Sequence, residues 1–214
     1  MSYPQKTAER DAVIAAALPH VPFDGWTQKT LQDAAATAGL KGAVQRLFPG
    51  GPKDAVAHFM DMADRAMVED LKAQDLSALK IRAKVALGVR LRLERWTPHR
   101  EAVRRALALA PHPAVAGSVL RNWGRVVDLI WRAAGDKSVD FNFYTKRGLL
   151  AAVYGATVLY WLDDRSEGCS GTWAFLDRRI EDVMQVPQIK AKIAERLKAL
   201  PSPFEILGRF SRTR

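Results

Sequence analysis

The chain has 214 residues, enough for one large or two small domains, and 48% of them are hydrophobic, so a sizeable core is expected. Its formal net charge of +10 favours an anionic partner, either nucleic acid or a lipid surface. Cys169 is the one cysteine, which excludes an intrachain disulfide and a cysteine-based zinc site and fits a reducing compartment. The first residues carry no apolar signal-peptide core. No run of about 18 uncharged apolar residues is present, so we expect no spanning helix.

The first third of the chain carries helical signals, and no segment alternates polar and apolar residues for long enough to predict a strand. We expect helices over residues 10–18, 31–38 and 52–71, with a short one before the Phe-Pro-Gly-Gly turn. Thr30 is the expected N-cap of the second helix, and Gly39 is suited to the left-handed turn that ends it. In the helix from residue 52, apolar residues at helical spacing mark a core face: Val56, Phe59, Met60, Ala63 and Met67.

The rest of the chain continues this pattern. Helices are expected over residues 77–96 and 140–162, and two others begin at Thr97 and Thr172, whose hydroxyls would serve as N-caps. Another helix with an apolar stripe ends before Gly135. The sequence therefore predicts an all-α protein of roughly nine or ten helices.

The segment over residues 140–162 is apolar for most of its length but begins with charged residues. Small residues three or four positions apart leave one helical face without bulk: Gly148, Ala152, Gly155 and Ala156. Such a face either lets another helix pack closely or leaves a lumen, which Leu149, Val153 and Leu159 would line. A dry lumen suits a long apolar ligand. Lys146 and Arg147 at its mouth suit a phosphate or a quinone oxygen, and the alternative for both is a surface salt bridge.

Two segments concentrate positive charge. Residues 80–105 have a net charge of +7, which either solvates a helix face or binds an anion, and residues 187–214 have a net charge of +5. The second segment also carries an apolar stripe with basic shoulders, formed by Ile189, Lys190, Ile193, Arg196, Leu197, Leu200 and Phe204. Such a segment would bind an anionic membrane, and the alternative is a last core helix.

Residues 8–60 resemble the DNA-binding part of TetR-type repressors, because two short helices joined by an Ala-Gly turn and followed by Phe-Pro read as a helix-turn-helix. The resemblance implies an all-helical C-terminal domain that encloses a ligand and dimerises. The motif departs from the family in lacking a Ser or Thr after the turn. Only Lys41, Gln45 and Arg46 are available to contact bases. We therefore expect a retained fold without DNA reading.

The motifs "AGD", "DFNFYTKR" and "TWAFLDRRIEDVM" lie in order between residues 134 and 184. They resemble the C-terminal domain of the ubiquinone-biosynthesis lipid-binding accessory family, the ninth of the named coenzyme Q proteins. That family has a TetR-like fold without DNA binding. The resemblance implies a non-enzymatic, membrane-associated homodimer that takes ubiquinone intermediates or other isoprenoid lipids out of the bilayer and presents them to a di-iron hydroxylase.

The resemblance also assigns roles to residues. It places Arg147, with its neighbour Lys146, at a phospholipid head group. A patch that contacts the hydroxylase would be formed by Asp128, Ile130, Asp140, Phe143 and Tyr144.

Together these features predict an all-α, TetR-like protein. Residues 1–60 would form a degenerate helix-turn-helix region, residues 61–186 a helical lipid-binding domain, and residues 187–214 a basic amphipathic tail. The histidines are scattered and no catalytic motif is present, so we expect no enzyme, no metal and no cofactor other than a bound lipid. The expected partners are membrane lipids, the hydroxylase and a second copy, but not nucleic acid. The expected location is cytoplasmic, peripheral to the inner membrane surface. The alternatives are a TetR-type ligand-responsive repressor and a structural subunit without a lipid.

Overall fold

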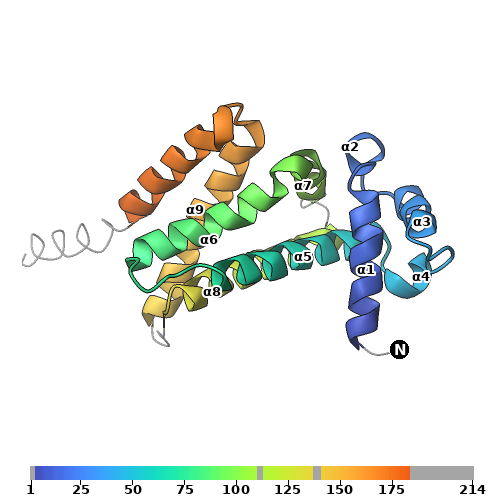
Figure 1. The fold of residues 1–214 in the computed structure, drawn as a ribbon, viewed down its shortest axis with the longest axis horizontal. Helices are drawn as coiled ribbons and strands as arrows, with labels where there is room; N and C mark the ends of the chain where they lie inside the picture. Colours follow the sequence, from blue (N-terminus) through green and yellow to red (C-terminus); the bar gives the residue numbers. More distant parts are fainter. Residues whose placement is uncertain (1–2, 110–112, 137–140, 184–214) are drawn as a thin grey trace, which may run out of the picture.

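The computed structural model describes residues 3–109, 113–136 and 141–183, and these ranges consist of helices joined by turns and loops and contain no strand (Figure 1). A group of short helices lies at one end, and the long helix α5 connects it to a bundle of longer helices. The predicted all-α class is confirmed.

The N-terminal unit has the order of a helix-turn-helix domain. It consists of α1 (Tyr3–Ala17), α2 (Val21–Asp24), α3 (Gln28–Thr37) and α4 (Val44–Leu47). Ile14, Leu31 and Phe48 are fully buried between these helices, so a small hydrophobic core holds the unit together. α4 is a single turn, which is short for a helix that reads DNA.

The N-cap of α3 is Thr27, so the prediction of Thr30 as the cap was wrong. The Thr27 hydroxyl oxygen accepts from the backbone N–H of Thr30 at 3.1 Å, the usual geometry of an N-cap. Thr30 is buried, and its hydroxyl donates to the Gly25 carbonyl at 3.0 Å. Gly39 has a φ of +73° and ends the helix as predicted.

The C-terminal bundle begins with α5, which packs on α1 as well as on α6 and α8. α5 crosses residue 60, where the sequence placed the first domain boundary. The helices are α5 (Pro52–Lys72), α6 (Ile81–Trp96), α7 (Arg100–Ala108), α8 (Pro113–Ala133), α9 (Phe141–Asp163) and a last one over residues 170–183, with 3₁₀ turns at Thr97–His99 and Glu167–Cys169.

Thr97 and Thr172 are not the N-caps that the sequence predicted. Thr97 lies in the 3₁₀ turn, and its hydroxyl donates back to the Leu93 carbonyl at 3.2 Å. Thr172 lies inside the last helix, and its N–H donates to Asp164 at 2.8 Å. Desolvation raises the pKa of Asp164, but hydrogen bonds from Ser166 and Thr172 outweigh it and hold that pKa well below its usual range.

Two glycines let α8 approach its neighbours closely. A Cβ on Gly88 of α6 would lie 3.1 Å from Ile130, and one on Gly155 of α9 would lie 2.6 Å from the Trp123 ring. The second distance is shorter than packed atoms tolerate. Trp123 therefore occupies the space that the missing side chain of Gly155 leaves.

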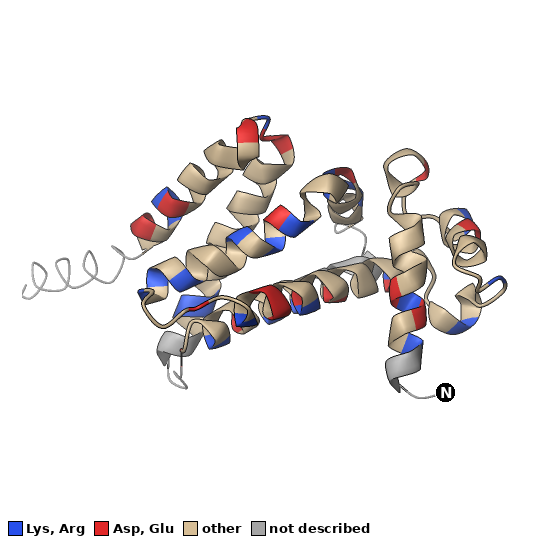
Figure 2. Ribbon diagram, viewed as in Figure 1, with Lys and Arg blue, Asp and Glu red and all other residues tan. Residues whose placement is uncertain are grey.

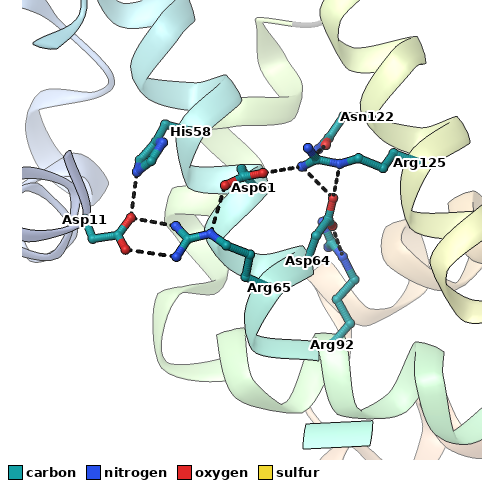
Figure 3. Close-up of polar contacts among 8 residues, drawn as sticks. All are labelled: Asp11, His58, Asp61, Asp64, Arg65, Arg92, Asn122 and Arg125. Carbon is teal, nitrogen blue, oxygen red and sulfur yellow. Dashed lines mark hydrogen bonds and ion pairs between the residues drawn. The ribbon is translucent and has the colours of Figure 1, made fainter. Parts of the chain in front are cut away.

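A buried carboxylate joins the helices of the bundle (Figure 3). Asp64 of α5, whose side chain is 3% exposed, accepts from Arg92 of α6 at 2.9 and 3.1 Å. It also accepts from Arg125 of α8 at 2.9 Å. Arg92 in turn donates to the hydroxyl of Tyr154 on α9 at 2.6 Å. Four helices therefore meet through one charged cluster.

Further ion pairs extend this cluster to the N-terminal unit (Figure 3). Arg125 pairs with Asp61 at 2.9 Å, and Asp61 accepts from Arg65 at 2.9 Å. Arg65 reaches Asp11 of α1 through two hydrogen bonds of 2.6 and 3.0 Å. His58 contacts the same carboxylate at 2.6 Å. The contacts run without a break from α1 to α9.

We predict that Asp64→Ala lowers the free energy of unfolding by about 3–5 kcal/mol, because it leaves the buried Arg92 without its carboxylate. Asp33→Ala is the matched control, since Asp33 pairs with Lys29 on the surface at 2.7 Å and should contribute less than about 0.5 kcal/mol. Urea denaturation followed by circular dichroism measures both. Equal losses in the two variants would contradict the role of the cluster.

The stability of the N-terminal unit should depend on pH through His58. Burial lowers the pKa of His58, and the charge of Arg10 acts in the same direction against the nearby Asp11. A histidine with a lowered pKa in the folded state is protonated more readily in the unfolded state, so stability falls as the pH drops below about 6.5. Desolvation raises the pKa of Asp11, but Arg65 and His58 lower it on balance, so its contribution is lost only below about pH 4.

We therefore expect that lowering the pH from 7 to 5 destabilises the wild type more than a His58→Gln variant. Urea midpoints at the two pH values provide the test. Parallel shifts in both proteins would show that another group titrates.

Candidate functional site

An apolar cavity of about 280 Å³ is lined by parts of the bundle helices. Figure 1 shows that these helix ends lie on the side of the bundle remote from the N-terminal unit. It is close to the lower size limit of small-molecule pockets, about 300 Å³. Its walls come from the beginning of α6, the C-terminal end of α8, the first half of α9 and the last described helix. The lining residues are Ile81, Arg82, Val85, Trp131, Asp136, Lys146, Leu149, Leu150, Val153, Ile180 and Val183.

Three of the residues that line the cavity are charged, namely Arg82, Asp136 and Lys146. Lys146 donates to Asp136 at 2.9 Å, and its ammonium lies 5.7 Å from the centre of the Trp131 ring. The Trp131 indole N–H donates to the Lys146 carbonyl at 3.2 Å, which ties the end of α8 to the beginning of α9. Lys146 therefore contributes a positive charge to a cavity that is lined mostly by apolar side chains.

Arg147, the other residue expected at a head group, is not among the residues that line the cavity. Its side chain is 13% exposed and contacts Asp128 at 2.7 and 2.9 Å and Asp136 at 3.2 Å. Arg132 also pairs with Asp128, at 2.6 Å. Three cations, Arg132, Lys146 and Arg147, thus share the carboxylates of Asp128 and Asp136. The role of Arg147 at a lipid head group stays a prediction.

The predicted lumen residues divide between two faces of α9. Leu149 and Val153 line the cavity. Gly148, Ala152 and Leu159 are exposed and Ala156 is half-buried, while Gly155 is covered by Trp123. These five residues are not among the cavity's lining. The small-residue face therefore lies on the outside of the bundle and against α8, because α9 rotates its bulkier face inwards.

The expected hydroxylase patch is only partly at the surface. Tyr144 is exposed, and Asp128 is half-buried in its ion pairs. Ile130 is 1% exposed and packs against Gly88, so its assignment to a contact surface was wrong. Asp140 lies outside the described residues, and the side chain of Phe143 is not described. The tail residues from Ile189 to Phe204 also lie outside them.

The helix-turn-helix offers little to a DNA duplex. Val44 and Leu47 of α4 are buried, which leaves Gln45 and Arg46 as its outward residues. Arg46 is engaged by Glu9 of α1 at 2.9 Å. Base reading needs several free polar side chains on one helix, and this single turn presents few.

The described ranges contain no group of three His, Cys, Asp or Glu side chains placed to hold a metal ion. None of the helices in these ranges has the length and apolar character needed to cross a bilayer. Cys169 is buried, and its sulfur accepts from Arg100 at 3.0 Å.

Sequence reasoning missed several cavity residues. Trp131 and Asp136 carry no local signal of a ligand site. Ile81 and Val85, like Ile180 and Val183, have the spacing of an inward helix face, but only tertiary packing brings the two pairs together.

The fold is similar to that of a TetR transcriptional regulator from Nitrosomonas europaea, whose crystal structure aligns with a TM-score of 0.67 over 82% of this chain and 97% of that one. The two sequences are 20% identical, so the likeness shows the fold alone.

The sequence comparisons are more specific. A profile of the COQ9 family matches residues 116–187. The chain is 36% identical to the mitochondrial ubiquinone biosynthesis protein COQ9 of Drosophila melanogaster over 84% of its length, and 31% identical to that of Homo sapiens over 88%. It spans 56% and 61% of the length of these relatives. The profile covers most of α8, all of α9 and the last described helix, and the chain belongs to the COQ9 family.

Proposed function

We propose that this chain is a non-enzymatic lipid-binding accessory protein of ubiquinone biosynthesis. It would extract an isoprenoid quinone intermediate from the membrane and present it to the pathway's di-iron hydroxylase. The observation that carries the proposal is the apolar cavity between α6, α8, α9 and residues 170–183, with Lys146 at its side. Membership of a family named for ubiquinone biosynthesis supports the choice of ligand.

The cavity suits the two parts of such a ligand. An isoprenoid tail gains about 25 cal/mol for each Å² of apolar surface that it buries against residues such as Val85 and Val153. A quinone oxygen or a phosphate would be met by the Lys146 ammonium, which would exchange part of its contact with Asp136. Because Arg147 also holds Asp136, the carboxylate keeps a partner when Lys146 turns to the ligand.

The hydroxylase would meet the protein beside the cavity. Tyr144, 73% exposed, lies on α9 two residues before Lys146 and five residues before Leu149. An exposed aromatic of this kind is a common anchor of protein interfaces. Asp140 and Phe143 would extend that surface.

A second copy would pack on the outer face of α8 and α9. The contacts of Trp131 with Lys146 and of Trp123 with Gly155 show that the helices run antiparallel, which brings Leu120 close to Leu159. These leucines are 72% and 65% exposed, and small residues surround them on both helices. Exposed apolar surface of this kind favours burial in a dimer.

The cavity predicts a sharp effect of a bulky residue within it. Leu149→Trp should remove most of the lipid that co-purifies, because the indole takes up the volume beside Val153. Gly148→Trp introduces the same indole one residue earlier, at an exposed position with open space around it, and should leave the lipid content unchanged. Lipid extraction and mass spectrometry measure both. Retention of lipid by Leu149→Trp would rule out this cavity.

The dimer surface predicts that Leu159→Glu converts the protein to a monomer of 23.8 kDa, since a charge on each copy would be buried against its mate. Phe23→Glu, a change at another exposed apolar residue that lies on α2 rather than on α9, should not alter the mass. Size-exclusion chromatography with light scattering measures the molecular mass of each protein. A wild type that is already monomeric would refute the proposed dimer.

A further inference from the structure

The beginning of α6 forms an exposed patch that joins the cavity. Residues 79–84, here called the α6 rim, carry two outward apolar side chains, Leu79 at 36% and Ile81 at 55% exposed. Lys80, Arg82 and Lys84 alternate with them. Ile81 and Arg82 also line the cavity, so the outer patch and the inner wall are one continuous surface.

The cations of the α6 rim differ from the others on the same helix. Further along α6, Arg90, Arg92 and Arg95 each pair with a carboxylate, from Glu94, Asp64 and Asp70 respectively. By contrast, the described part of the chain supplies no ion pair to Lys80, Arg82 or Lys84.

The local sequence explains this difference. No acidic residue occurs from residue 76 to residue 93. The nearest one upstream, Asp75, accepts from the backbone N–H of Ser77 at 2.9 Å. Figure 2 shows the basic residues at the beginning of α6 without acidic neighbours on that helix turn. The charge is thus left for an outside anion.

We infer that the α6 rim is a membrane-docking surface, which seats the mouth of the cavity on an anionic phospholipid bilayer. The inference rests on the proposed lipid-carrying function and names the part of the described protein that meets the membrane. Leu79 and Ile81 enter the interfacial region, and Lys80, Arg82 and Lys84 contact lipid phosphates. A lipid then passes from the bilayer along Ile81 into the cavity without crossing water.

The pairing of apolar and basic residues favours a membrane over other anions. A nucleic acid would use the cations but would leave Leu79 and Ile81 without a partner. An acidic protein could cover both, but it would close the mouth through which a lipid must enter. The last described residue, Val183, also lines the cavity, so residues 184–214 start at the same end of the molecule.

The test uses the full chain and vesicles of phosphatidylcholine with or without phosphatidylglycerol. Lys80→Gln/Lys84→Gln removes two cations that do not line the cavity. Since each cation near an anionic surface strengthens binding roughly fivefold, the double variant should bind anionic vesicles about 25-fold more weakly. Lys41→Gln/Lys53→Gln removes the same charge from exposed positions in the first part of the chain and should bind like the wild type.

A labelling experiment reports the orientation. A fluorophore on Leu79→Cys should shift to shorter wavelength on anionic vesicles, whereas one on Phe23→Cys should not, and the native Cys169 is buried. If the two lysine pairs weaken binding equally, or if the label at position 79 is silent, the docking inference is overturned. It is also overturned if the wild type binds neither vesicle, as expected of a site for an acidic protein.

The lipid content of the same proteins separates the two proposals. Both lysine variants should retain the lipid of the wild type when it is supplied in detergent. A wild type that carries no lipid yet binds vesicles through the α6 rim would refute the carrier function and leave the docking surface standing. If the protein carries lipid but its vesicle binding does not change when Lys80 and Lys84 are replaced, the docking surface is refuted and the carrier function stands.

Discussion

The buried carboxylate of Asp64 sets the positions of the helices on which the cavity depends. A charge removed from water must be paired, and Asp64 is paired with Arg92 of α6 and Arg125 of α8 at once. Arg92 passes the constraint to Tyr154 of α9. Since α6, α8 and α9 supply three of the four cavity walls, a shift of any one of them would break a charged hydrogen bond. The apolar cavity can persist because charged hydrogen bonds, rather than side chains that fill it, keep α6, α8 and α9 in position around it.

Contacts of the same kind hold the N-terminal unit against the bundle. Asp11 of α1 is held by Arg65 of α5, and Trp26 packs on Phe59 with ring centres 5.2 Å apart. The Trp26 indole N–H donates to the Ala102 carbonyl of α7 at 3.1 Å. These bonds give the unit a structural role in the bundle. A helix-turn-helix reduced to one turn of α4 is therefore compatible with a protein whose function lies at the other end.

The sequence determined the helices better than their faces. Of the five predicted core residues in α5, Val56, Phe59, Ala63 and Met67 are buried and Met60 is half-buried, because polar residues separate the apolar ones and define a single face. The prediction of the N-cap of α3 failed because two hydroxyl groups compete for that position. The hydroxyl oxygens of Thr27 and Thr30 lie 2.7 Å apart, and by sequence spacing alone either residue could cap the helix. α9 is apolar on every side, so its periodicity could not distinguish Val153, which lines the cavity, from Leu159, which faces outwards.

The apolar character of α9 has a physical reason in its surroundings. One face, with Leu149 and Val153, borders the cavity, and Gly155 lets α8 approach until Trp123 fills its place. The third face, at Leu159, is apolar but exposed in a single copy. The cavity, the contact with α8 and the exposed apolar face together explain why α9 lacks a polar side, although none of the described helices is suited to span a bilayer. The charged beginning of α9, held by Asp128 and Asp136, fixes its rotation and so decides which residues face the cavity.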